Sequence, residues 1–143
     1  MIAVDTNVLV YAHKRESPWH DQALAALQAL VRSAEPWALP WPCLHEFYSV
    51  ATNPRLYQPT STPEQALAQI DAWVAAPNAR LLAEGHDHFA RLIDLVRAAD
   101  VRGPKVHDAK IAAICLAHGV RELLTMDRDF SRYPALKTRS LVA

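Results

Sequence analysis

Short apolar runs alternate along the chain with longer segments in which apolar side chains recur every three or four residues. The runs at residues 2–4, 37–39, 80–83 and 122–125 are typical of short buried strands, and residues 138–142 are a candidate fifth strand. The longer segments carry leucine, isoleucine and valine at helical spacing. Strands and helices are therefore expected to alternate.

Proline marks where several of these helices begin. Ser17 and Thr62 each precede a proline, so we expect both to be N-caps, with the first helix running to about Ser33. The remaining helices are predicted over residues 8–12, from Pro42 to the break at residues 53–54, over residues 89–96, and from the break at residues 103–104 to Gly119.

This alternation predicts an α/β fold with a parallel sheet and helices on both faces. We expect a three-layer α/β/α arrangement around a central, mainly parallel sheet of four to five short strands. The 143 residues are about the size of one domain, so residues 1–143 are predicted to form a single domain. The sequence contains neither a G-x-G-x-x-G motif nor a Walker A motif, so a glycine-rich loop that binds phosphate is not expected.

Composition says little about binding partners but indicates the compartment in which the protein is expected. Fifteen Lys and Arg residues balance fifteen Asp and Glu residues, so a nucleic-acid surface would have to come from local placement of charge. Cys43 and Cys115 fit two buried thiols better than a disulfide. The longest apolar run, residues 111–117, is too short for a membrane span, so we expect a cytoplasmic protein without a membrane partner.

Acidic residues follow two of the predicted strands. Asp5 ends the first strand, and Asp127 and Asp129 follow the fourth. Ligands of open α/β sheets bind beyond the carboxyl ends of the strands, so these three side chains should converge at one edge. Each also has a purely structural explanation, because Asp favours the turns at strand ends.

Two further acids occupy unusual helical positions. Asp108 precedes Ile111, Ala112 and Cys115 by three, four and seven residues, which places it on the apolar stripe. Glu46 is expected on the flank of a buried helix face. Asp108 could simply complement a helix dipole, and Glu46 could be an ordinary solvated residue. Taken together, however, acids this close need a cation, and an all-oxygen set suits Mg²⁺ or Mn²⁺.

At these residues the sequence resembles the PIN-domain family and, within it, the VapC-type toxic ribonucleases of bacterial toxin–antitoxin pairs. The resemblance covers essentially the whole chain. Asp5-Thr6-Asn7 resembles the family's opening motif, Glu46 the central acid and Asp108 the third acid. The segment Thr125–Phe130, which contains Asp127 and Asp129, resembles the closing motif.

The resemblance implies metal-dependent hydrolysis of RNA by an endoribonuclease that acts as the toxin of a toxin–antitoxin pair. It implies one or two Mg²⁺ or Mn²⁺ ions, an RNA substrate, a cognate antitoxin protein and a homodimer. The implied catalytic residues are Asp5, Glu46, Asp108 and Asp127, and the same four with Asp129 are the implied metal ligands. Asp127 is preferred over Asp129 because it lies nearer the strand end.

Other side chains near the predicted crevice are less informative. Thr6, Asn7 and Thr125 are candidates for hydrogen bonds that orient the acids. Tyr11, Trp41 and Tyr57 could stack on bases or pack in the core. His45 and His107 each precede a key acid and could support it or be ordinary surface residues. The candidate phosphate contacts are Lys14, Arg15, Arg55, Lys105, Lys110, Arg128 and Arg132.

Two other functions remain open on the sequence alone. A receiver-like Mg²⁺-binding signalling domain also gathers acids at strand ends, but it needs an Asp at the end of a strand in the middle of the chain. The third strand here runs into Ala83 and Glu84 instead. A non-catalytic PIN-like binding module would not need the complete set of four acids.

Overall fold

The computed structural model of the chain describes residues 1–142. Five parallel strands form one sheet in the order β3-β2-β1-β4-β5. The strands are β1 (Ile2–Val4), β2 (Trp37–Pro40), β3 (Ala79–Leu82), β4 (Glu122–Leu124) and β5 (Lys137–Arg139). The prediction of an α/β fold around a short parallel sheet is confirmed.

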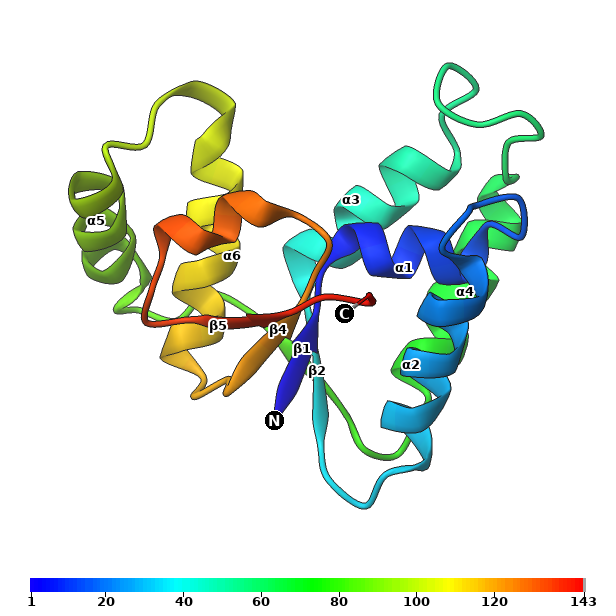
Figure 1. The fold of residues 1–143 in the computed structure, drawn as a ribbon, viewed down its shortest axis with the longest axis horizontal. Helices are drawn as coiled ribbons and strands as arrows, with labels where there is room; N and C mark the ends of the chain where they lie inside the picture. Colours follow the sequence, from blue (N-terminus) through cyan, green and yellow to red (C-terminus); the bar gives the residue numbers. More distant parts are fainter. Residues whose placement is uncertain (143) are drawn as a thin grey trace.

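Helices lie on both sides of this sheet (Figure 1). In that view α5 and α6 lie to the left of the sheet, α2 and α4 lie to the right, and α1 and α3 lie toward the top. The helices are α1 (Thr6–His13), α2 (His20–Arg32), α3 (Trp41–Ala51), α4 (Pro63–Val74), α5 (His88–Ala99) and α6 (Val106–Ala117), with 3₁₀ turns η1 (Gly103–Lys105) and η2 (Arg128–Arg132).

One of the two predicted N-caps is confirmed. The Thr62 hydroxyl accepts a hydrogen bond from the Gln65 amide, and the Gln65 side chain accepts one from the Thr62 amide, which completes a capping box. The cap at Ser17 is wrong, because α2 begins only at His20. Ser17 instead closes a turn, with its hydroxyl accepting from the Trp19 amide and its carbonyl from the His20 amide.

The predicted fifth strand exists but is displaced toward the amino terminus. β5 occupies residues 137–139 rather than 138–142, and all three of its residues are exposed. It pairs with β4 at the edge of the sheet, where the Arg139 guanidinium contacts the Glu122 carboxylate at 2.7 Å. Apolar periodicity cannot find such a strand, since backbone pairing rather than burial holds it.

The center of the sheet is the most deeply buried part of the molecule. Ala3 and Val4 of β1 are fully buried between β2 and β4. Because β1 is the central strand, its carboxyl end lies midway along the edge formed by the carboxyl ends of the strands. Cys43 and Cys115 are buried free thiols, as expected. Residues that follow the neighbouring parallel strands β1 and β4 therefore lie at the same edge of the sheet.

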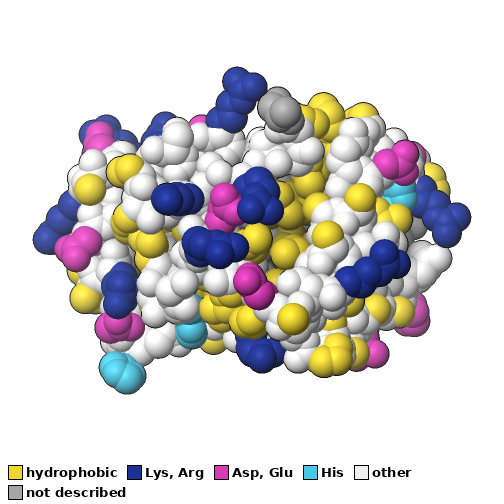
Figure 2. Space-filling model, turned by 60° about the horizontal axis from the view of Figure 1, so that its bottom comes forward, with side chains coloured by type: hydrophobic (Ala, Val, Ile, Leu, Met, Phe, Trp, Pro, Cys, Tyr) yellow, Lys and Arg dark blue, Asp and Glu magenta, His cyan; other side chains and the backbone are white. Residues whose placement is uncertain are grey.

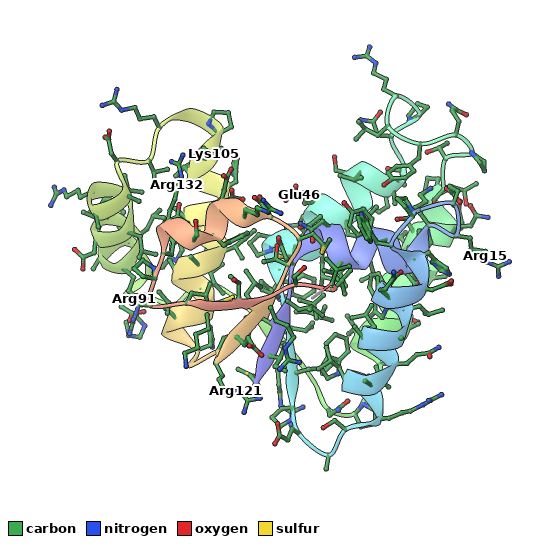
Figure 3. All side chains as sticks on the ribbon, viewed as in Figure 1. Arg15, Glu46, Arg91, Lys105, Arg121 and Arg132 are labelled. Carbon is green, nitrogen blue, oxygen red and sulfur yellow. The ribbon has the colours of Figure 1, made fainter. Side chains whose placement is uncertain are left out.

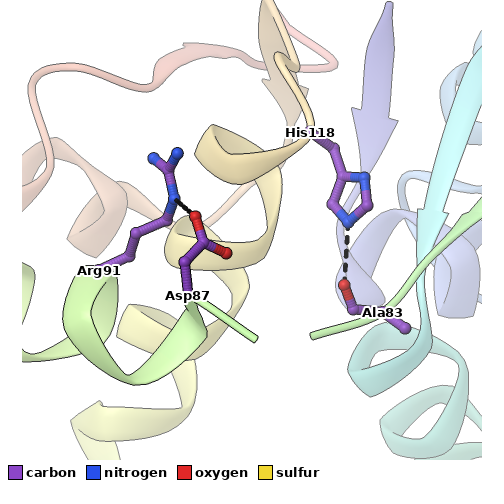
Figure 4. A network of polar contacts seen from close by, with 4 residues as sticks. All are labelled: Ala83, Asp87, Arg91 and His118. Atoms are coloured by element: carbon purple, nitrogen blue, oxygen red, sulfur yellow. Dashed lines mark hydrogen bonds and ion pairs between the residues drawn. The ribbon is translucent and has the colours of Figure 1, made fainter. Parts of the chain in front are cut away.

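A hydrogen bond at the carboxyl-terminal end of α6 connects this helix to the segment between β3 and α5. The His118 ring donates from Nε2 to the Ala83 carbonyl over 2.9 Å, and Asp87 pairs with Arg91 one turn along α5 (Figure 4). Gly119 follows with φ of +69°, a conformation that favours glycine at a helix end. The His118 contact and the turn at Gly119 fix the carboxyl-terminal end of the helix that carries Asp108.

The surface shows no strong bias of charge on the face drawn in Figure 2, where basic and acidic side chains are interspersed. This agrees with the formal net charge of zero. Within residues 1–142, none of the helices has the length and apolar character needed to cross a membrane.

Candidate active site

Asp5 is the buried anchor of the site. It ends β1 and caps α1, with its Oδ1 accepting from the Thr6 amide at 2.8 Å. Its Oδ2 accepts from the Thr125 hydroxyl at 2.7 Å and from the Asn7 side chain at 3.4 Å. The residue is only 5% exposed. Neutral donors therefore hold both carboxylate oxygens.

A second set of hydrogen bonds joins the start of α1 to the segment after β4. The Asn7 side-chain carbonyl accepts from the Met126 amide at 3.2 Å, and the Thr125 hydroxyl accepts from the Asp127 amide at 3.0 Å. Asp127 in turn accepts from the Asp129 amide through its Oδ1 at 2.9 Å. These contacts hold Asp127 beside Asp5 and provide the orienting hydrogen bonds expected of Asn7 and Thr125.

The other two acids approach from helices. Glu46 lies on α3, and its Oε2 accepts from the Thr6 hydroxyl at 3.3 Å. Asp108 lies in the first turn of α6 and is half-buried. In Figure 3 the Glu46 label lies between the part of the molecule that contains α6 and the part that contains α3. Glu46 is more exposed than the predicted flank position implied, because it faces an open hollow.

Two adjoining hollows meet at the acids. A hollow of about 210 Å³ is lined by Asp5, Glu46, Asp108 and Asp127 together with residues of α1 and Tyr57. A larger cleft of about 620 Å³ shares Glu46, Asp108 and Asp127 and continues between α3 and α6. The structure thus brings the four predicted acids to one place, with space on either side of them.

Crowding and burial oppose ionisation of these acids. Burial raises the pKa of Asp5 to about 6, against the lowering effect of its hydrogen bonds to Thr125 and the Thr6 amide. Burial and the neighbouring Asp127 charge raise the pKa of Asp108. A bound cation would relieve both effects, so the donor set fits a hard divalent ion.

Asp129 has a different environment. Its carboxylate forms an ion pair with the Lys105 ammonium, which lowers the pKa of Asp129. Carboxylate oxygens of Asp108, Asp127 and Asp129 lie within 4.8 Å of one another, and among residues 1–142 this closely spaced group includes neither Asp5 nor Glu46, so its geometry makes Asp129 a candidate ligand. The Lys105 ammonium already neutralises Asp129, which sets its surroundings apart from those of the other acids.

Sequence reasoning missed one neighbour of Asp5 and misplaced one basic residue. The buried Cys43 thiol lies 3.7 Å from Asp5 Oδ1 and can donate to it. Lys14 is not a free phosphate contact, because it is buried, donates to the Ser61 hydroxyl at 2.9 Å and lies over the Tyr57 ring. Both outcomes depend on packing between distant segments, which residue spacing does not reveal.

The other predicted basic residues divide by position. Lys105 and Lys110 line the larger cleft, and Arg128 lines a separate hollow beside Asp127. Arg15 lies at the outer edge of the molecule, far from Glu46 in the view of Figure 3. His45 and His107 both line the larger cleft near the acids, and both are exposed to solvent.

Comparison with known proteins identifies the family to which this chain belongs. Residues 2–136 match the PIN domain. Ribonuclease VapC43 from Mycobacterium tuberculosis is 35% identical over 97% of this chain and 94% of its own length. Ribonuclease VapC48 from the same organism is 30% identical over 94% of this chain and 93% of its own length.

Solved structures share the fold at lower identity. The VapBC2 complex from Rickettsia felis, bound to a promoter DNA fragment, aligns with a TM-score of 0.72 at 19% identity over 98% of both chains. VapC20 from Mycobacterium tuberculosis, described as a toxin that cleaves the sarcin-ricin loop, aligns with a TM-score of 0.70 at 16% identity over 92% of this chain and 93% of that chain. The chain belongs to the PIN-domain family and, within it, to the VapC group.

Proposed function

We propose that this protein is a metal-dependent endoribonuclease that hydrolyses RNA phosphodiester bonds and acts as the toxin of a toxin–antitoxin pair. The observation that carries the proposal is the convergence of four acids from four separate segments on one hollow. The 35% identical relative is named a ribonuclease, which supports the same activity here.

The proposed ligands of Mg²⁺ or Mn²⁺ are Asp5, Asp108 and Asp127, with Glu46 available for a second ion. A bound ion of this kind lowers the pKa of water and stabilises negative charge on a phosphodiester undergoing attack. Buried Asp5 supplies a rigid carboxylate, because the Thr125 hydroxyl and the Thr6 amide hold its two oxygens.

Glu46 is the acid best placed to take a proton. It is exposed to the hollow, and the Thr6 hydroxyl holds its Oε2, whereas no residue among 1–142 donates a hydrogen bond to its Oε1. In the proposed reaction Glu46 accepts a proton from the attacking water as the new P–O bond forms. The bond to the leaving ribose oxygen then breaks, and that oxygen is protonated from solvent.

Cleavage of total RNA by the purified protein tests the activity. We expect discrete fragments with Mg²⁺ or Mn²⁺, none with EDTA, and none with Asp108→Asn. Asp94→Asn is a matched control, because Asp94 is an exposed acid on α5 outside both hollows, and it should cleave like the parent. A folded parent protein that leaves every RNA intact in the presence of metal would favour the non-catalytic binding module.

The toxin role rests on the family. Solved relatives include the VapBC-1 complex from nontypeable Haemophilus influenzae. We expect this chain to bind a cognate antitoxin and to inhibit growth when expressed without it, while Asp5→Asn should not inhibit growth. The homodimer implied by the family stays a prediction that light scattering of the purified chain would check.

A further inference from the structure

An aromatic pair on α3 lies beside the acids and has no part in holding them. The Trp41 and His45 rings lie one helical turn apart, with centroids 5.9 Å apart and planes inclined by 32°. His45 lines the larger cleft, whereas Trp41 does not line it but is 38% exposed and packs against the His45 ring. The two rings therefore form one continuous aromatic surface that runs from the wall of the cleft to solvent.

The two hollows at the acids differ in what they can hold. Ligand sites commonly have volumes of about 300–1,000 Å³. The hollow at Asp5 measures about 210 Å³, whereas the cleft bounded by His45 measures about 620 Å³. The larger cleft therefore has the volume of an ordinary ligand site, and it shares Glu46, Asp108 and Asp127 with the hollow at Asp5.

The opposite wall of this cleft carries lysines beside the acid Asp108, which the proposed function assigns to the metal ion. Lys105, His107 and Lys110 line it from η1 and α6. Lys105 is engaged by Asp129, whereas Lys110 has no ion-pair partner within residues 1–142. An aromatic wall facing a basic wall is the arrangement with which proteins bind unpaired nucleic acid, stacking the base and contacting the phosphate.

We propose that Trp41 and His45 form a base-stacking subsite for an unpaired RNA nucleotide next to the scissile phosphate. This inference rests on the proposed function for its choice of RNA as ligand. His45 supplies the ring at the wall of the cleft, and Trp41 packs against it and extends the aromatic surface. Because a paired base is already stacked within its helix, the subsite selects single-stranded RNA.

Binding tests the subsite separately from cleavage. We would measure the affinity of Asp108→Asn for a short fluorescein-labelled RNA of mixed sequence by anisotropy in EDTA, and for the same sequence as a duplex. Adding Trp41→Ala or Trp41→Leu should weaken single-strand binding by about 5- to 150-fold and leave duplex binding unchanged. Trp41→Phe, which keeps a ring, should stay within about threefold of the parent.

A matched control is available elsewhere on the surface. Phe89 on α5 is 72% exposed and lies outside both hollows, so Phe89→Ala should change neither affinity. Unchanged single-strand binding by Trp41→Ala, or equal weakening toward both RNAs, would overturn the subsite.

The cleavage assay separates the two proposals. In the otherwise active protein, Trp41→Ala should raise KM for single-stranded RNA with a smaller change in kcat. A parent that cleaves RNA while Trp41→Ala keeps the parent's KM would overturn the subsite alone. A parent that never cleaves, but whose single-strand binding depends on Trp41, would overturn the proposed function alone.

Discussion

Asp5 and Asp129 both follow the carboxyl end of a strand, yet their surroundings are opposite. Asp5 is 5% exposed, is held by neutral donors, and has its pKa raised by burial to about 6. The Asp129 side chain is 40% exposed, is paired with Lys105, and has its pKa lowered by that partner.

This difference indicates which acid requires a cation. Asp129 already has one in the Lys105 ammonium, at a surface where water screens the pair. Within residues 1–142 the groups that hold Asp5 are uncharged donors, and Glu46 and Asp108 add repulsion. A buried acid without a cationic partner is costly to ionise, so a divalent ion gains most by binding there.

The largest expected effect comes from neutralising Asp5, and neutralising Asp129 provides the comparison. Asp5→Asn should reduce RNA cleavage by about 100-fold or more, because a metal-held transition state loses several kcal/mol of stabilisation. Asp129→Asn should stay within about tenfold of the parent, since Asp129 is not the proposed ligand. Rates for both variants at saturating Mg²⁺ measure the contrast, and equal losses would remove it.

The Thr125 hydroxyl, which donates a hydrogen bond to Asp5, is the next group to test. Thr125→Val removes the hydroxyl that binds Asp5 Oδ2, and we expect Mn²⁺ affinity to fall by about 10- to 100-fold. Thr125→Ser keeps the hydroxyl and should restore most of the affinity. Calorimetric titration with Mn²⁺ would measure both. Equal affinities for Val and Ser would show that packing, not the hydroxyl, matters at this position.

The pH dependence of metal binding separates the two acids further. A metal must displace the proton of Asp5, whose pKa is raised to about 6, so affinity should fall about tenfold between pH 7 and pH 5. Asp129→Asn should show the same dependence. Flat Mn²⁺ affinity over this range would contradict a role for Asp5 as ligand.

The same shift affects stability in the opposite sense. In metal-free protein the raised pKa means that Asp5 favours folding most below its ordinary pKa of 3.8, and this contribution is lost as the pH rises through about 6. Added Mg²⁺ should therefore raise the unfolding temperature more at pH 7 than at pH 5. Thermal unfolding with and without Mg²⁺ at the two pH values measures this.

Lys105→Ala should have the smallest effect. The pair that it removes is exposed, and exposed pairs contribute little to stability. We expect no measurable change in the unfolding temperature and a change of less than about threefold in Mg²⁺-dependent cleavage. A large loss of cleavage would instead make Lys105 a direct contact of the substrate.

Much of this site could be predicted because its acids occupy positions that local rules identify. Asp5 follows a short buried run, and Asp108 interrupts an apolar helical stripe. Buried β1 and the alternation of strands and helices predict the sheet for the same reason: apolar periodicity reports burial.

What could not be predicted depends on contacts between distant segments. Lys105 and Asp129 meet only because η1 packs near η2, and Lys14 is buried by a turn far along the chain. Ser17 resembles an N-cap, yet the turn through Trp19 uses its hydroxyl before α2 begins. In these cases tertiary packing or a competing turn overrides a local preference.

The position of a bound metal ion tests the central claim most directly. Anomalous diffraction from crystals of the protein soaked in Mn²⁺ would locate the ion without relying on activity. The account predicts a peak bounded by Asp5, Asp108 and Asp127, with Lys105 still paired to Asp129. A peak coordinated by Asp129 with Asp5 uncoordinated, or no peak at the acids at saturating Mn²⁺, would contradict it.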